Sequence, residues 1–163
     1  MKKEKMNDKG FSLVELIIVI AIMAVLVVVL APQYLKYVER SRNSTDLQNA
    51  TAMVTAIQVY AADPNVEDTA AFQSGATFKL TCSDTGTAVT GTAGASGSVS
   101  GDVAAKKALD EAKIDYAKTK CKSKSAWTEY YVEGTVNSDG SITFTYSSNS
   151  AESPDAFATA MTK

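Results

Sequence analysis

The chain has 163 residues, a hydrophobic fraction of 45% and a formal net charge of -2 at pH 7. It contains no histidine, which excludes Ser-His-Asp and Cys-His nucleophile activation and any histidine metal site. Because phosphate backbones are bound by clustered cations, a mildly acidic chain is not expected to take nucleic acid as its main partner. We therefore expect no enzyme, no metal and no cofactor.

The N-terminal region is a short basic stretch followed by a long apolar run. Lysines 2, 3, 5 and 9 precede the run, and the 21 residues from Phe11 to Ala31 contain one ionisable side chain, that of Glu15. At about 1.5 Å per residue, a helix of this length crosses the roughly 30 Å hydrocarbon core of a bilayer. The lysines predict a cytoplasmic N-terminus by the positive-inside rule.

Two simpler interpretations of this run fit less well. A secretory signal peptide has a shorter apolar region and a small-residue cleavage site, whereas this run ends in Ala31-Pro32. A plain membrane anchor leaves Glu15 unexplained, since a carboxylate at the bilayer centre costs on the order of 2.5 to 3.5 kcal/mol. If the chain is cut after Gly10, Phe11 becomes a cationic amino terminus one helical turn from Glu15, and the same group on a neighbouring copy is a partner for that acid.

The stretch Lys9-Gly10-Phe11-Ser12-Leu13-Val14-Glu15-Leu16-Ile17 resembles the N-terminus of prepilins. That group comprises type IV pilins, type II secretion pseudopilins and competence pilins. The resemblance implies cleavage by a prepilin peptidase between Gly10 and Phe11, N-methylation of Phe11, and pairing of Glu15 with the preceding subunit's N-terminus in a helical filament. Pro32 falls where many pilins carry proline. Ala24 is a departure, since many members have glycine there.

The apolar pattern continues at helical spacing beyond Pro32, which predicts a kink inside one long helix. The helix is expected to stop at Asp63-Pro64, because the residue before a proline is disfavoured in the helical conformation. Its second half is amphipathic and should bury one stripe against a soluble domain. The predicted organisation is a cleaved leader at 1–10, a transmembrane and filament-core helix at 11–31, its amphipathic half at 32–62, and a globular head at 63–163.

The head begins with an alternating segment and a stretch of small residues. Residues 76–82 alternate apolar and polar side chains, which predicts a half-buried strand. Residues 83–101 contain almost no bulky side chain and predict an exposed flexible loop. Residues 103–118 predict a helix capped by Ser100 or Asp102. The lysines at 118, 120, 122 and 124 are interpreted as a solvated loop or, alternatively, as a contact to another subunit or an anionic surface.

The C-terminal third has the clearest hairpin in the sequence, at about 127–147. Two alternating segments flank the turn sequence Asn137-Ser138-Asp139-Gly140. Ser153-Pro154-Asp155 then predicts the start of a short last helix. The expected fold is α+β, with the long N-terminal helix packed on a small antiparallel sheet, as in the pilin fold.

The two cysteines, Cys82 and Cys121, lack the spacing of a zinc or thioredoxin-like motif. In an extracytoplasmic domain a single disulfide between them is a candidate, and two reduced buried thiols are the alternative. A closed loop of about 40 residues would reduce the freedom of the unfolded chain by roughly 4 kcal/mol.

These features favour a structural subunit of a type IV pilus with a role in adhesion, motility or biofilm formation. The expected partners are further copies in a helical filament, a prepilin peptidase, the pilus assembly platform with minor pilins, and the membrane before assembly. The subunit would first be a single-pass protein of the inner or cytoplasmic membrane and then part of an extracellular pilus. A type II secretion pseudopilin or competence pilin is the alternative within the family; a membrane-tethered binding module and a membrane-anchored enzyme are alternatives from other classes.

Overall fold

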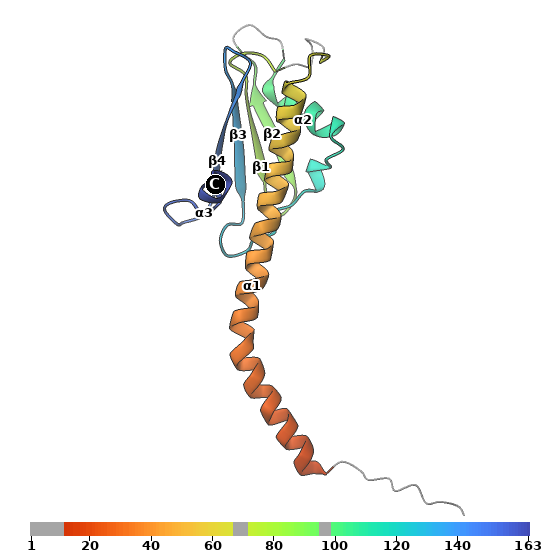
Figure 1. The fold of residues 1–163 in the computed structure, drawn as a ribbon, viewed down its shortest axis with the longest axis vertical. Helices are drawn as coiled ribbons and strands as arrows, with labels where there is room; N and C mark the ends of the chain where they lie inside the picture. Colours follow the sequence, from red (N-terminus) through yellow and green to blue (C-terminus); the bar gives the residue numbers. More distant parts are fainter. Residues whose placement is uncertain (1–11, 67–71, 95–98) are drawn as a thin grey trace, which may run out of the picture. The chain divides into compact units, whose positions relative to one another are not determined.

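A computed structural model describes residues 12–66, 72–94 and 99–163, and the chain divides into two compact units, Met1–Val38 and Glu39–Lys163. Each unit is described by itself (Figure 1). The elements are α1 (Leu13–Ala61), β1 (Thr77–Cys82), β2 (Thr87–Thr92), α2 (Gly101–Glu111), η1 (Tyr116–Lys118), β3 (Tyr130–Val136), β4 (Ile142–Ser148) and α3 (Ala156–Met161). The fold is α+β, which confirms the predicted class.

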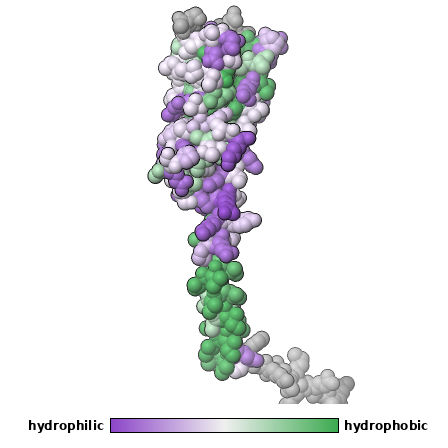
Figure 2. Space-filling model, turned by 60° about the vertical axis from the view of Figure 1, so that its left-hand side comes forward, coloured by the Kyte–Doolittle hydropathy of each residue, from purple (hydrophilic) through white to green (hydrophobic). Residues whose placement is uncertain are grey.

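The part of α1 in the first unit is apolar on all sides. Every residue from Leu13 to Leu30 has an exposed side chain, and Figure 2 shows an almost continuous hydrophobic surface over this stretch. By length and composition α1 is able to cross a membrane. The helix runs through Pro32 without interruption, and the kink stays a prediction.

The part of α1 in the second unit is amphipathic. Its buried residues recur at helical spacing and comprise Asp46, Ala50, Met53, Val54, Ile57 and Tyr60. The helix ends at Ala61, shortly before Asp63-Pro64. It ends there because proline disfavours the helical conformation in the residue before it. This stripe forms one side of the core of the second unit.

The four strands form one antiparallel sheet in the order β2-β1-β3-β4. Phe78 and Leu80 on β1 and Val132 on β3 lie on the buried face, and Leu80 pairs with Val89 on β2 and with Val132 on β3. Strict alternation in β1 and β3 explains why the sequence pattern predicted both strands. The hairpin turn is also as predicted, with Gly140 at a φ of 81°, a conformation that glycine adopts without steric cost.

The segment 83–101 is not the continuous loop that its composition predicts. Residues 87–92 form β2, which pairs along all six residues of β1, and Ala93 bridges to Ser100. The sequence TAVTGT has little side-chain bulk, so its hydrophobic pattern is weak and the strand is formed by the hydrogen bonds that β1 offers at its free edge. Residues 95–98 lie outside the described part of the chain.

The helix expected at 103–118 ends earlier, because α2 stops at Glu111 in a Schellman motif. Lys113 has a φ of 58°, its amide donates to the Asp110 carbonyl at 3.0 Å, and the Ile114 amide donates to the Leu109 carbonyl at 2.9 Å. A single 3₁₀ turn, η1, follows. Lysine occupies the left-handed position usually held by glycine, so the sequence contained no glycine to mark this end.

The last helix, α3, begins after Asp155 as predicted. The Asp155 carboxylate accepts hydrogen bonds from the amides of Phe157 and Ala158, and also from the amide and hydroxyl of Ser148 on β4. Phe157 is fully buried and stacks on Tyr130, with ring centroids 4.6 Å apart. The cap and this aromatic contact hold α3 on the edge strand of the sheet.

Candidate functional site

The predicted processing site and the first described turn of α1 are adjacent in sequence. Gly10 and Phe11 lie outside the described residues, which begin at Ser12. The Glu15 carboxylate accepts a hydrogen bond from the Ser12 amide at 2.9 Å. A carboxylate in the first turn satisfies an amide that has no partner within the helix and is favoured by the helix dipole. Within one copy, therefore, Glu15 caps its own helix.

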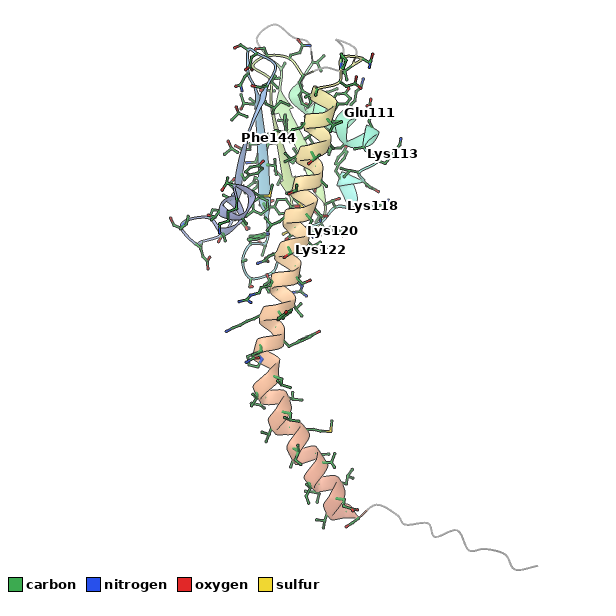
Figure 3. All side chains as sticks on the ribbon, viewed as in Figure 1. Glu111, Lys113, Lys118, Lys120, Lys122 and Phe144 are labelled. Atoms are coloured by element: carbon green, nitrogen blue, oxygen red, sulfur yellow. The ribbon has the colours of Figure 1, made fainter. Side chains whose placement is uncertain are left out.

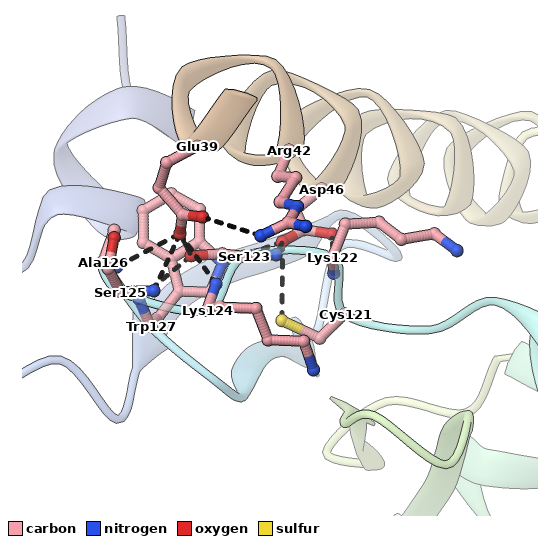
Figure 4. A network of polar contacts seen from close by, with 10 residues as sticks. All are labelled: Glu39, Arg42, Asp46, Cys121, Lys122, Ser123, Lys124, Ser125, Ala126 and Trp127. Atoms are coloured by element: carbon pink, nitrogen blue, oxygen red, sulfur yellow. Dashed lines mark hydrogen bonds and ion pairs between the residues drawn. The ribbon is translucent and has the colours of Figure 1, made fainter. Parts of the chain in front are cut away.

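The second unit contains two carboxylates, those of Asp46 and Glu39, whose hydrogen-bond network was not predicted from the sequence. Asp46, on the buried stripe of α1, is fully buried and accepts hydrogen bonds from the amides of Lys122 (2.7 Å) and Ser123 (2.9 Å). It also accepts from Trp127 Nε1 at 3.1 Å and from the Cys121 thiol at 3.4 Å (Figure 4). No ion pair of Asp46 exists among the described residues, so its charge is stabilised by neutral donors.

Glu39, two turns earlier on α1, binds the same segment. One carboxylate oxygen, Oε1, accepts from the Ser123 hydroxyl and from the amides of Lys124 and Ser125, at 2.7 to 2.8 Å. The other oxygen lies 3.5 Å from an Arg42 guanidinium nitrogen. Together Glu39 and Asp46 fix the backbone of residues 121–126, named here the clamped segment, against α1.

The hydrogen bonds to Glu39 change its acid strength. Partial burial by itself would raise the pKa of Glu39, but the amides of Ser125 and Lys124 and the Ser123 hydroxyl outweigh it and lower the pKa from 4.5 to about 2. A lowered folded-state pKa means that this stabilisation is complete above the unfolded-state value of 4.5 and is lost as the pH falls from there toward about 2.

We expect Glu39→Gln to flatten the acid limb of the stability curve. Between pH 5 and pH 3 the wild-type chain should lose on the order of 1 to 2 kcal/mol more stability than the variant, because the variant has no carboxylate to protonate. Urea unfolding of the full chain in detergent, followed by tryptophan fluorescence, measures the difference. Glu152→Gln, which changes an exposed glutamate, is the matched control; equal acid limbs for wild type and Glu39→Gln would contradict the prediction.

The two cysteines lie in the same region as free, buried thiols. Cys82 contacts the Thr119 carbonyl, and the Cys121 amide donates to the Ser83 carbonyl, so the ends of the predicted disulfide are in neighbouring segments. Burial, with the nearby Asp46 carboxylate, raises the pKa of Cys121 to about 12. Such thiols are poor nucleophiles. The disulfide stays a prediction.

The lysines of the predicted cluster are exposed. Lys118 pairs with Asp115 at 2.7 Å, whereas Lys120, Lys122 and Lys124 form no ion pair among the described residues. Cys121 and Ser123 alternate with them and are buried, so the clamped segment presents its lysines outward. Residues 12–66, 72–94 and 99–163 contain no group of histidine, cysteine, aspartate and glutamate able to hold a metal ion.

Comparisons with known proteins match part of the chain. Residues 5–31 match the family model of the prokaryotic N-terminal methylation motif. The chain therefore carries the prokaryotic N-terminal methylation motif. It is 41% identical over 59 residues to a type IV major fimbrial protein FimA of Dichelobacter nodosus, which covers 36% of this chain and 38% of that protein. It is 40% identical over 62 residues to the fimbrial protein EcpC of Eikenella corrodens, covering 38% and 40%.

The matches to these fimbrial proteins cover 33 to 39% of the chain. The chain spans about two fifths of the length of the curated relatives it matches, and no solved structure matches it. Gly10, Phe11 and Glu15 fall within the matched motif, and the clamped segment lies outside it. The N-terminal methylation motif and the architecture of the second unit are therefore supported by separate observations.

One signal in the sequence could have revealed Asp46. It stands in line with Ala50, Met53 and Ile57, at the spacing of the buried stripe. A carboxylate at a core position requires several donors, and the nearest available ones are backbone amides of a segment distant in sequence. Sequence periodicity indicates the burial of Asp46 but not the identity of its donors.

Proposed function

We propose that this chain is a structural subunit of a type IV pilus, assembled after a prepilin peptidase cuts between Gly10 and Phe11. Phe11 would then carry the N-methyl group that the methylation motif implies. The same motif, and the fimbrial relatives matched over 36% and 38% of the chain, support this assignment. A role of the filament in adhesion, motility or biofilm formation follows from the same proposal.

The observation that carries the proposal is the exposed apolar surface of α1. From Leu13 to Leu30 every side chain is exposed, and Glu15 is the one ionisable group in that range. A monomeric soluble protein does not leave such a surface in water, so it needs lipid before assembly and other copies of the same helix afterwards. A subunit that leaves the membrane to enter a filament has lipid around this helix first and other copies of the helix afterwards.

The proposal assigns a role to each part of the chain. Residues 1–10 are the removed leader, 11–31 the membrane and filament-core helix, 32–62 its amphipathic half, and 63–163 the head. The subunit first resides in the inner or cytoplasmic membrane with its N-terminus in the cytoplasm, and then at the cell surface. Its proposed partners are further copies of the chain, the peptidase, the assembly platform and minor pilins.

Mass spectrometry of sheared cell-surface material tests the processing step. The expected N-terminal peptide starts at Phe11 and is 14 mass units heavier than the unmodified peptide, roughly the mass of one CH₂ group. The same peptide from cells lacking prepilin-peptidase activity serves as the control and should begin with the leader. Surface fibres whose subunits start at Met1 would contradict the proposal.

A further inference from the structure

A groove lies within the second unit between the last turns of α1 and the C-terminal end of α2. Its lining consists of Ala56, Val59, Tyr60 and Asp63 on the α1 side and Ala108, Glu111 and Ala112 on the α2 side. Val59 is 67% exposed, which is high for a large apolar side chain in a folded domain. Among the described residues neither Asp63 nor Glu111 forms an ion pair. The groove is thus apolar, with two carboxylates that form no ion pair, of which Asp63 accepts hydrogen bonds from the amide and the side chain of Asn65 at 2.9 Å.

This combination suits a lysine side chain. Lysine buries its aliphatic stem along apolar surface while its ammonium remains at a polar edge. Here the alanines and Val59 would contact the stem, and Asp63 or Glu111 would accept from the ammonium. An anionic ligand is disfavoured by the two carboxylates, and a purely apolar one would bury them without partners.

The chain itself offers lysines of this kind on the clamped segment and just before it. Lys120, Lys122 and Lys124 are exposed and have no ion pair among the described residues, and the backbone of Lys122 and Lys124 is fixed by Asp46 and Glu39. A segment that is already ordered loses little conformational entropy when it binds. Figure 3 labels two of these lysines, Lys120 and Lys122, and one residue of the groove, Glu111. All three lie on the same flank of the unit.

These lysines do not reach the groove of their own copy. The Lys122 amide is bonded to Asp46, and Val59 follows Asp46 by 13 residues of α1, which places it about 20 Å further along the helix. That distance exceeds the length of a lysine side chain. A contact between the two surfaces therefore joins different copies, displaced along the helix axis.

We propose that the groove between α1 and α2 binds the lysines at 120, 122 and 124 of a second copy of this chain. Because the two surfaces differ, the contact is heterologous, and repetition of a heterologous contact that does not close produces an open filament rather than a dimer. This inference rests on the proposed pilus function and names the surfaces by which neighbouring heads meet. It also makes the heads, and not only the helices, contribute to the filament.

Zero-length carbodiimide crosslinking of intact wild-type filaments, followed by peptide mass spectrometry, tests the contact. We expect isopeptide links from Lys120, Lys122 or Lys124 to Asp63 or Glu111, and these must be intermolecular because of the distance within one copy. The Lys79–Glu133 pair, 2.8 Å apart within one copy, is the internal positive control. Filaments that show the control link and none of the others would overturn the inference while leaving the proposed function intact. Absence of filaments in the wild type would instead refute the proposed function.

Charge exchange provides a second measurement. Lys122→Glu and Glu111→Lys should each lower the yield of sheared filaments several-fold, and the double exchange should restore it to within about twofold of wild type, since paired sites in contact are not additive. Lys163→Glu and Glu152→Lys reverse exposed charges elsewhere and should leave the yield unchanged. A double exchange with a yield equal to the product of the single effects would overturn the contact.

Discussion

Asp46→Ala should strongly destabilise the second unit. The side chain is fully buried and accepts from two amides, an indole and a thiol, so its removal leaves a cavity and three N–H donors without this partner, two of them buried. A buried donor that is left without a partner costs about 1 to 3 kcal/mol, so the loss of this network should cost about 3 to 5 kcal/mol out of a total stability of about 5 to 15 kcal/mol. For a unit of this size the melting temperature should fall by roughly 10 to 20 °C.

Circular dichroism of the full chain in detergent measures this change, with the near-ultraviolet signal of Trp127 reporting on the clamped segment itself. Asp46→Asn keeps the size of the side chain and one acceptor oxygen, and should lie between the wild type and Asp46→Ala. Asp110→Ala removes an exposed aspartate from α2 and should change stability by less than about 0.5 kcal/mol. A melting temperature for Asp46→Ala within a few degrees of the control would show that the network contributes little.

Glu15→Gln should abolish most filament assembly while leaving membrane insertion intact. The glutamine oxygen can still accept from the Ser12 amide, as Glu15 does at 2.9 Å, so the helix cap is retained and only the charge is removed. Loss of an ion pair to the Phe11 amine of a neighbouring copy, in surroundings without water, should reduce filament yield by at least tenfold, or about 1.4 kcal/mol.

Comparison with Glu15→Val separates the two roles of this side chain. Valine removes both the charge and the acceptor, so equal defects in both variants identify the charge as the cause, whereas a defect confined to valine would identify the cap. Filament yield in the sheared fraction and carbonate-resistant membrane association of the subunit are measured on the same cells. Normal piliation by Glu15→Gln as sole subunit would contradict the charged contact.

The clamped segment connects stability with assembly. The carboxylates of Glu39 and Asp46 accept hydrogen bonds from the backbone amides of Lys124 and Lys122 and not from the lysine side chains. The ammonium groups of Lys122 and Lys124 therefore remain available at the surface. Asp46→Ala would therefore weaken the head and also release the segment proposed to meet the neighbouring copy. Lys122→Glu changes only the surface charge, so a defect in assembly without a change in melting temperature is expected for that variant alone.

Local patterns in the sequence determine much of this protein. The unbroken apolar run from Phe11 to Ala31 defines the first part of α1, and the stop at Asp63-Pro64 and the turn at Asn137–Gly140 act within a few residues of their own positions. The prepilin motif is equally local, because the peptidase and the neighbouring subunit would meet a short linear segment. Such features depend on backbone preferences and spacing, which a sequence displays directly.

Only the tertiary structure decided β2 and the carboxylate network. The residues of β2 have too little apolar bulk to predict a strand, and their conformation comes from pairing with the edge of β1. Asp46 lies more than 70 residues from its donors in the sequence. No local pattern predicts that the amides of residues 122 and 123 will lack other hydrogen-bond partners. The physical reason is the same in both cases: hydrogen-bond partners that are distant in the chain are selected by folding of the whole head.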